Sequence, residues 1–223
     1  MHRAVIFDLG GVVLDSPMLG IARYEQEMGL EPGFINRRIV ETGPDGAWAR
    51  LEQGRLDMAQ FFDAFESECA AVGARISARD LMGRMGESGG VRPVMLEAIH
   101  CIRERGLAVA ALTNNWKSPE AETQDEAARV GVGVGDLESH FDLFVESSVV
   151  GLSKPDPRIY LHACEGLAIE PSQAIFLDDI GRNLKAAHQL GMTTIKVVSP
   201  EQALEELGSH LGFPLRREIK GSA

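Results

Sequence analysis

The sequence predicts an α/β fold: a doubly wound parallel sheet, interrupted after its first strand by a block of helices. Two observations carry this prediction. Short apolar runs that end in polar or acidic residues alternate with helical patterns from residue 91 onwards. Residues 16–88 contain helical patterns but no convincing strand. Repeated strand–helix alternation is typical of parallel sheets with right-handed crossovers.

The first strand is predicted at Ala4–Phe7, directly before Asp8. This run is too short for a helix and apolar enough to be buried on both faces. Gly10 and Gly11 follow, and they let the backbone turn sharply and approach a ligand closely. A carboxylate at the carboxyl end of such a strand lies where open α/β sheets bind their ligands. The alternative is that Asp8 only caps the following turn.

The remaining core elements follow in alternation, with glycines and prolines near their ends. We predict helices over 91–105, 120–129, 156–165, 183–190 and 200–211, and strands over 107–112, 141–145, 174–177 and 193–198. The Gly-Val-Gly-Val-Gly run at 131–135 lacks the spacing of a nucleotide-binding loop, so we expect a plain loop. The polar end from residue 216 is expected to fray.

The block over residues 16–88 is predicted to hold helices at 18–28, 34–40, 58–71 and 78–85. Glycine-rich turns separate them. The residues allow two organisations. The block is either a long helical excursion of one continuous α/β domain, or a separate domain inserted into a core made of residues 1–15 and 89–223.

Composition places the chain among soluble globular proteins, with 223 residues, 44% of them hydrophobic and 25% charged. No apolar stretch approaches the roughly 20 residues that span a bilayer, and we expect no secretory signal and a cytoplasmic location. Cys69, Cys101 and Cys164 are scattered, so buried thiols are expected rather than disulfides or a zinc site. The formal charge of −11 disfavours nonspecific binding to nucleic acid or anionic membranes.

Four polar motifs stand at predicted strand ends and loops. After Asp8 come Thr113-Asn114, then Lys154, then Asp178-Asp179 with Asn183 behind them. Together they supply a carboxylate, a hydroxyl and amide, an ammonium and a carboxylate pair, which suits phosphoryl transfer through an aspartyl-phosphate. Each motif alone has a simpler explanation: turn chemistry, a solvated surface lysine, or a helix N-cap pair.

The four motifs, in this order, resemble the haloacid dehalogenase-like (HAD) superfamily of hydrolases. Residues 113–116, 154–160 and 176–185 look most like the phosphatase domain at the N-terminus of soluble epoxide hydrolase and its bacterial relatives. The resemblance covers nearly the whole chain and is weakest between residues 15 and 90. It implies a HAD-like Rossmannoid core, with residues 16–88 as a helical cap domain.

The resemblance also implies an activity: Mg²⁺-dependent hydrolysis of a small phosphorylated metabolite, such as a sugar phosphate or another phosphate with a good leaving group. Asp8 would be the nucleophile and would bind Mg²⁺ together with the Gly10 carbonyl and Asp179. Asp178 would support Asp179 without binding the ion directly, although neighbouring carboxylates can exchange the roles of ligand and support. Asn183 would stabilise the acidic loop.

Four residues would hold the phosphoryl group: Gly11, Thr113, Asn114 and Lys154. The Lys154 ammonium would neutralise charge that develops in the transition state.

Gly10 is the main departure from the family, whose active phosphatases usually have a second Asp at this position as general acid and base. That group is typically worth about 10² to 10⁴ in rate. The chain therefore either replaces it or works slowly, and substrates with good leaving groups are expected to be favoured. Asp15 is a candidate replacement, but it is also a plausible turn residue near the hinge.

Two other activities remain open. The chain could be a weak or silent HAD domain that binds a phosphometabolite or a protein, or a metal-independent dehalogenase, which the pair Asp178-Asp179 disfavours. Trp48, Arg50 and Glu52 of the cap are candidates for substrate selection. Trp48 could equally be cap core, and Arg50 a surface residue. The sequence does not distinguish a monomer from a homodimer.

Overall fold

The structure is a computed structural model that describes residues 1–87, 90–117 and 137–215. The predicted helix at 120–129, the glycine-rich loop at 131–135 and the polar end from residue 216 lie outside the described residues.

The core is a five-stranded sheet in the order β3–β2–β1–β4–β5, and every pairing is parallel. Its strands are β1 (Ala4–Phe7), β2 (Ala108–Thr113), β3 (Leu143–Glu146), β4 (Ala174–Asp178) and β5 (Thr193–Lys196). The chain leaves β1 towards β2 and β3 and later returns to the other side of β1 as β4. This creates a topological switch point beside β1, where open α/β sheets bind their ligands.

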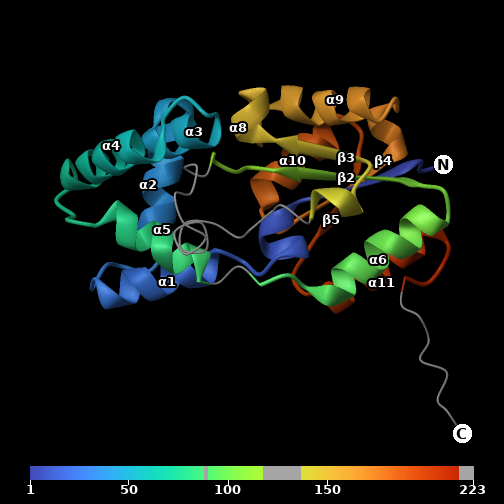
Figure 1. Cartoon of the computed structure of the whole chain (residues 1–223), viewed down its shortest axis with the longest axis horizontal. Coiled ribbons are helices and arrows are strands. Elements are labelled where there is room, and N and C mark those ends of the chain that lie inside the picture. Colours follow the sequence, from blue (N-terminus) through green and yellow to red (C-terminus); the bar gives the residue numbers. More distant parts are fainter. Residues whose placement is uncertain (88–89, 118–136, 216–223) are drawn as a thin grey trace, which may run out of the picture.

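Helices cover both faces of the sheet (Figure 1). One face packs against α6 (Pro93–Glu104) and α11 (Pro200–Leu211), and the other against α9 (Pro157–Gly166) and α10 (Gly181–Gln189). Successive strand residues point to opposite faces. Val5 and Phe7 therefore join the cluster with α6 and α11, whereas Ile6 joins the cluster with α9 and α10. Burial on both faces explains why the central strands β1 and β4 begin as continuous apolar runs.

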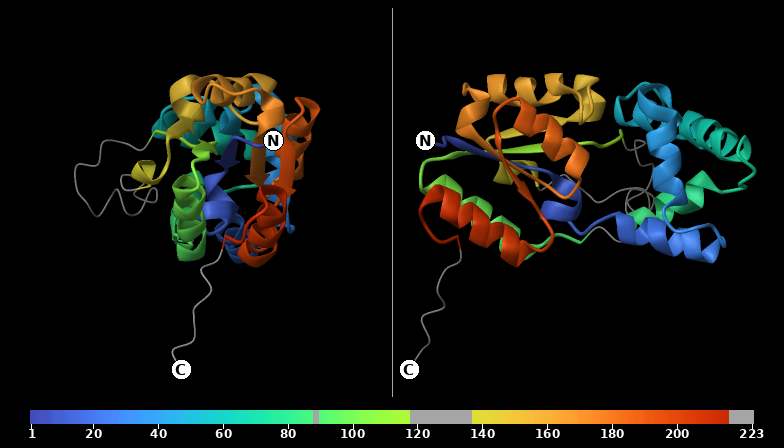
Figure 2. Two further views of the ribbon diagram at one scale, coloured as in Figure 1. Left: turned by 90° about the vertical axis from the view of Figure 1, so that its right-hand side faces the viewer. Right: turned by 180° about the vertical axis from the view of Figure 1, so that it is seen from behind.

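A helical unit, residues 18–86, lies beyond the carboxyl edge of the sheet (Figures 1 and 2). It contains α1 (Met18–Glu27), α2 (Phe34–Thr42), α3 (Ala47–Glu52), α4 (Met58–Ala70) and α5 (Ala78–Gly86). The unit has its own apolar core, in which Trp48, Phe61 and Phe65 meet with ring centroids 5.4–5.5 Å apart. A separate core is what an inserted helical block requires.

Glutamates connect these helices by accepting hydrogen bonds from backbone N–H groups at helix starts. The buried Glu25 of α1 accepts from Gly33 and Ile35 at 2.7 and 2.9 Å. Glu66 and Glu68 of α4 accept from the first residues of α5 and α3 at 2.8 and 2.7 Å. Such contacts are favourable because helix N-termini carry unpaired donors and a partial positive charge.

Two chain segments join the helical unit to the core. Leu14 and Val91 pair as an antiparallel bridge. Arg92 reinforces this hinge with an ion pair to Asp15 at 3.1 Å and a hydrogen bond to the Gly11 carbonyl at 2.8 Å. The hinge is therefore tied directly to the turn that follows Asp8.

The structure confirms the predicted fold class, and each predicted element within the described residues appears with its ends within two residues of those observed. Among the described α-helices, α3 and α8 (Ser147–Val150) were not predicted. The N-cap residue of α3, Gly46, has no side chain to cap the helix, and α3 is stabilised by burying Ala47, Trp48 and Leu51. Six residues are too few for a periodic signal, and tertiary packing supplies the stability. The domain boundaries remain a prediction.

Within the described residues, each helix is too short or too polar to span a bilayer. The cysteines are free, as expected. Cys69 and Cys164 are buried, but Cys101 is partly exposed rather than buried.

Candidate active site

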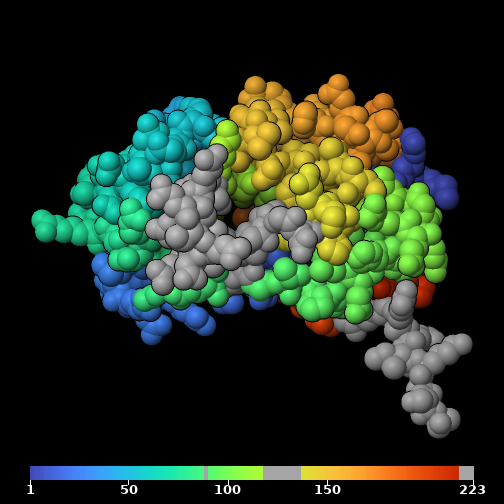
Figure 3. Space-filling model, viewed as in Figure 1, coloured from blue at the N-terminus to red at the C-terminus, as the bar shows by residue number. Residues whose placement is uncertain are grey.

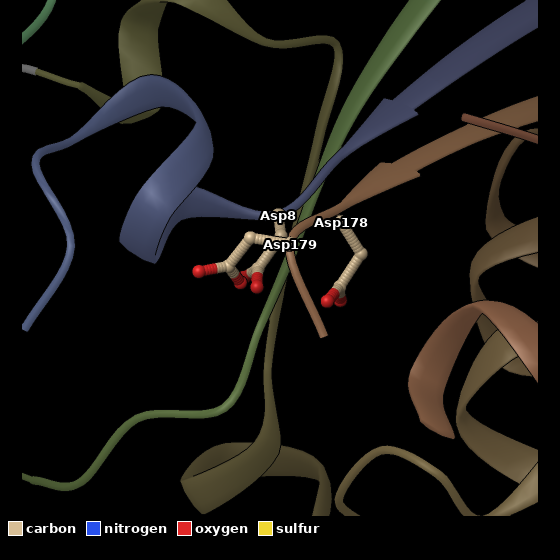
Figure 4. Close-up of side chains that lie close together, drawn as sticks. All are labelled: Asp8, Asp178 and Asp179. Carbon is tan, nitrogen blue, oxygen red and sulfur yellow. The ribbon is translucent and has the colours of Figure 1, made fainter. Parts of the chain in front are cut away.

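Polar side chains from neighbouring strand ends meet at the carboxyl edge of the sheet. Asp8 follows β1, Thr113 ends β2, and Asp178 and Asp179 stand at the end of β4. The N–H of Asp8 donates to the Leu177 carbonyl at 2.9 Å, which binds the end of β1 to β4. Figure 4 shows Asp8, Asp178 and Asp179 close together where these two strands end. The parallel pairing therefore gathers three of the four motifs.

Lys154, from the loop before α9, completes the set. Its Nζ atom is 2.8 Å from Asp8 Oδ1 and 2.9 Å from Asp178 Oδ2. The side chain is only 1% exposed, so Lys154 is not the solvated surface lysine of the alternative interpretation. A buried ammonium depends on its partners, because an unpaired buried charge is strongly destabilising.

The adjacent carboxylates Asp178 and Asp179 have different surroundings. Asp178 is fully buried and accepts hydrogen bonds from Lys154 Nζ, the Ile180 N–H and Asn183 Nδ2 at 2.9, 2.7 and 3.0 Å. Within the described parts of the chain, Asp179 accepts only from its own backbone N–H. Asp179 is therefore available to a ligand, whereas Asp178 fixes the groups around it. The roles of Asp179 as metal ligand and of Asp178 as its support stay predictions.

The carboxylates form a candidate metal site, since Asp8, Asp178 and Asp179 offer oxygens that lie within 4.8 Å of one another. Three carboxylates and one ammonium leave an excess of negative charge that a dication would neutralise. The buried Asn183 Oδ1 has no hydrogen-bond partner among the described residues, so it could receive a metal-bound water. An all-oxygen donor set suits Mg²⁺. These residues fit the predicted ion, and the Gly10 carbonyl stays a prediction.

The electrostatics of the carboxylates also favour a bound cation. Burial raises the pKa of Asp8 and of Asp179, the charge of Asp178 raises both further, and the Lys154 ammonium opposes these shifts. Without a dication, both groups hold a proton more readily than an exposed Asp does. A bound cation reverses this preference.

The two glycines after Asp8 have different physical roles. Gly11 has φ +76°, and a Cβ atom there would overlap Asp179 Oδ2 and lie 2.6 Å from Cγ of the same carboxylate. Gly10 has φ −63°, and the nearest atom to a Cβ there would be Pro17 Cδ at 3.4 Å. Gly11 therefore makes room for the acidic loop, whereas Gly10 could carry a side chain. The predicted substrate contact of Gly11 stays a prediction.

Asn114 organises the loop that carries Lys154. Its Oδ1 accepts from the Lys154 N–H at 2.8 Å, and its Nδ2 donates to the Lys154 carbonyl at 3.0 Å and to Glu52 Oε2 at 3.1 Å. The Thr113 hydroxyl makes only a 3.5 Å contact with the Asn114 carbonyl. Among the described residues, no closer partner occupies the Thr113 hydroxyl, so it is available for a phosphoryl oxygen, while the Asn114 side chain is already engaged.

A cavity of about 250 Å³ lies between the core and the helical unit, with Asp8, Thr113, Lys154 and Asp179 in its wall. Much of the remaining wall is apolar: Leu14, Pro17, Met18, Ile21, Ile39, Trp48, Met85 and Trp116. Figure 3 shows the helical unit (blue to green) packed against the core near α8 (yellow). The structure thus places the predicted catalytic groups at the junction of the two parts.

The predicted cap residues differ in whether they line the cavity. Trp48 and Glu52 line it, but Arg50 does not. Trp48 also belongs to the core of the helical unit, so it occupies both predicted positions, and its part in substrate selection stays a prediction. Arg182 and Trp116 line the cavity as well, although no role was predicted for them from the sequence. Arg182 lies close behind the acidic pair in the sequence, and Trp116 lies close behind Asn114. These positions could have identified both residues as candidates for the site.

The chain belongs to the haloacid dehalogenase-like hydrolase family, whose model matches residues 2–191. It is 38% identical over 217 residues to acyl-CoA dehydrogenase family member 10 of Mus musculus, covering 96% of this chain and 20% of that protein. It is 34% identical over 227 residues to bifunctional epoxide hydrolase 2 of Sus scrofa, and the match covers 96% of this chain and 39% of that protein. The chain therefore spans one fifth to two fifths of these relatives, and the predicted resemblance to epoxide hydrolase is confirmed.

A third relative matches over most of both chains. The phosphorylated carbohydrates phosphatase of Thermotoga maritima is 27% identical over 197 residues, covering 86% of this chain and 83% of that one. Among solved structures, a HAD family enzyme of Bacteroides thetaiotaomicron in complex with magnesium and inorganic phosphate aligns with a TM-score of 0.58 at 20% identity, covering 88% and 94%. An L-2-haloacid dehalogenase of Xanthobacter autotrophicus with covalently bound chloropropionic acid aligns with a TM-score of 0.57 at 19% identity, covering 100% and 92%. The two structural matches support the fold.

Proposed function

We propose that this HAD hydrolase is a Mg²⁺-dependent phosphatase that cleaves a small organic phosphate through a phosphoryl-Asp8 intermediate. The observation that carries the proposal is Asp179, a carboxylate close to Asp8 that has no hydrogen-bond partner from another described residue. Beside a phosphate substrate this negative charge is unfavourable unless a dication is bound. A magnesium and phosphate complex of a protein with this fold supports the assignment.

The residues divide the chemical work as follows. Asp8 Oδ1 is fixed by the Leu9 N–H at 2.7 Å and by Lys154 Nζ at 2.8 Å, which leaves Oδ2 to attack phosphorus. Lys154 and the Thr113 hydroxyl hold phosphoryl oxygens and stabilise the charge of the transition state. Mg²⁺, held by Asp8 and Asp179, would neutralise the negative charge of the phosphate. Attack of water on the phosphoryl group then frees Asp8 and releases inorganic phosphate.

The lining of the cavity indicates which kind of organic phosphate the site would bind. Much of its lining is apolar, and Met18, Ile21, Ile39 and Trp116 belong to this apolar part. Such a wall favours an organic phosphate with apolar surface over a fully hydroxylated sugar phosphate, because polar groups without partners are costly to bury. The T. maritima relative is named for phosphorylated carbohydrates, so both classes belong in a substrate panel.

Dehalogenation is the competing chemistry, because a dehalogenase shares the fold. A 2-haloacid brings its own carboxylate and releases a halide anion, so a free Asp179 beside Asp8 would repel both. We therefore favour phosphate. Chloride release from 2-chloropropionate in the presence of EDTA would contradict this preference.

A silent binding domain is the second candidate, and Gly10 is the observation that favours it. Since the space at Gly10 accepts a Cβ, Gly10→Asp can restore the missing acid. A large gain in rate would indicate a decayed site, and a loss would indicate a different working arrangement.

The direct test is hydrolysis of p-nitrophenyl phosphate with Mg²⁺ and with EDTA, by the wild-type protein and by Asp8→Asn. Turnover that needs Mg²⁺ and is abolished in Asp8→Asn supports the phosphatase. Wild-type turnover no greater than that of folded Asp8→Asn would instead support the silent domain.

A further inference from the structure

The missing acid at Gly10 raises the question of which group supplies the proton. Four carboxyl groups line the described cavity: Asp8, Asp15, Glu52 and Asp179. Asp8 is the proposed nucleophile, and Asp179 is a proposed metal ligand. Asp15 forms an ion pair with Arg92 in the hinge. Glu52 is the one carboxyl group of this set without another assignment.

Glu52 is the last residue of α3, and it reaches across the junction between the helical unit and the core. Its Oε1 accepts from Trp48 Nε1 at 3.1 Å, and its Oε2 accepts from Asn114 Nδ2 at 3.1 Å. Asn114 also holds the backbone of Lys154 at 2.8 and 3.0 Å. The carboxyl group is therefore fixed in the cavity wall, one hydrogen-bonded residue away from the lysine that contacts Asp8.

The surroundings of Glu52 suit proton transfer. Burial raises the pKa of its carboxyl group to about 7, against the opposing effects of the Trp48 and Asn114 hydrogen bonds and of the cations Arg182 and Lys154. A group of this kind is populated in both protonation states near neutral pH, which is the condition for efficient acid and base catalysis.

We infer that Glu52 is the general acid and base that replaces the side chain absent at Gly10. In the first step, Asp8 attacks phosphorus, the bond to the leaving oxygen breaks, and the Glu52 proton passes to that oxygen. In the second step, the Glu52 carboxylate takes a proton from water as the water oxygen attacks phosphorus. The bond from phosphorus to Asp8 then breaks, and Glu52 is protonated again.

This inference rests on the proposed phosphatase function. It assigns the nucleophile to the core and the proton donor to the helical unit, so catalysis requires the two parts to be in contact. It also predicts that substrates with poor leaving groups are cleaved, which Gly10 alone argues against.

The test compares Glu52→Gln with wild type on two aryl phosphates in the presence of Mg²⁺. p-Nitrophenyl phosphate has a good leaving group and phenyl phosphate a poor one, so only the second depends strongly on an acid. We expect kcat/KM of Glu52→Gln to fall by about 10² to 10⁴ on phenyl phosphate and by at least ten times less on p-nitrophenyl phosphate. An equal loss on both substrates would overturn the inference, because a merely structural role does not depend on the leaving group.

Gln53→Ala is the matched control. Gln53 bonds Ser153 at 3.2 Å across the same junction but does not line the cavity. Its removal should change both substrates by the same factor. A selective loss on phenyl phosphate in this control would attribute the effect to docking of the two parts and would refute an acid role for Glu52.

A pH profile of the wild-type protein needs no variant. With phenyl phosphate, kcat/KM should fall as pH rises above about 7, the pKa of Glu52, and this limb should be much weaker with p-nitrophenyl phosphate. Identical profiles would contradict the inference even if Glu52→Gln fails to fold. Absence of Mg²⁺-dependent turnover on either substrate would overturn both the inference and the phosphatase, whereas an active wild type with unselective variants overturns only the inference.

Discussion

Replacement of Gly11 by alanine tests whether the turn after Asp8 exists to admit the Asp179 carboxylate. Gly11 has φ +76°, where an L-residue costs about 1–2 kcal/mol. The new Cβ would overlap Asp179 Oδ2, so the carboxylate must move away. Gly10→Ala is the matched control, because φ there is −63° and the Cβ would meet only Pro17, at 3.4 Å and beyond. A compatible Gly→Ala change stabilises by about 0.4–1 kcal/mol.

The free energy of unfolding of Gly11→Ala should therefore be about 1.4–3 kcal/mol lower than that of Gly10→Ala. For a protein of this size, 1 kcal/mol corresponds to about 2–4 °C in Tm, so Gly11→Ala should melt about 3–12 °C below Gly10→Ala. Because Asp179 is displaced, Gly11→Ala should also bind Mg²⁺ at least about 10-fold more weakly, seen as a smaller Mg²⁺-induced rise in Tm. Differential scanning fluorimetry with and without Mg²⁺ measures both effects. Equal Tm values and equal Mg²⁺ shifts for the two variants would refute the reasoning.

Three further predictions concern buried charges. Lys154→Met leaves the buried carboxylate partners of Lys154 without a counter-charge and should destabilise the protein by about 3–5 kcal/mol in urea unfolding. Because burial raises the pKa of Asp8, this loss should shrink as pH falls and Asp8 takes up a proton. Since the folded pKa of Glu52, about 7, lies above its unfolded value, its stabilising contribution is complete below about pH 4.5 and is lost as pH rises through 7. The stability of wild type relative to Glu52→Gln should therefore fall by up to about 3 kcal/mol over this interval, and a pH-independent difference would contradict the assignment. Glu25→Ala removes two hydrogen bonds to a buried charge and should cost about 3 kcal/mol in the same urea assay. Glu27→Ala, which breaks an exposed ion pair on the same helix, should cost less than about 1 kcal/mol, and equal costs would show that Glu25 is not a cap.

The fold was predictable because the sheet is buried on both faces. Continuous apolar runs such as Ala4–Phe7, with glycine or proline residues between elements, leave few alternatives to a parallel sheet. The helix α3 was missed because its stability comes from Trp48 and Leu51 packing against distant helices and from a Glu68 cap. No local pattern carries such contacts.

The site was partly predictable for the same reason. Motifs at strand ends must converge in a parallel sheet, so the proximity of Asp8 to Asp178 follows from topology. The link from Glu52 to Asn114 joins residues 62 positions apart, and the sequence suggested only that Glu52 could face the site. Likewise, the steric need for Gly11 depends on Asp179, which only the folded structure places beside it.

The central claim is that Asp8 carries the phosphoryl group. The most direct measurement is acid-quenched peptide mass spectrometry of wild type and Asp8→Asn after mixing with p-nitrophenyl phosphate and Mg²⁺. The account predicts one phosphoryl group on the wild-type peptide that contains Asp8, and none on Asp8→Asn. Turnover without that adduct, or turnover that persists in Asp8→Asn, would contradict it.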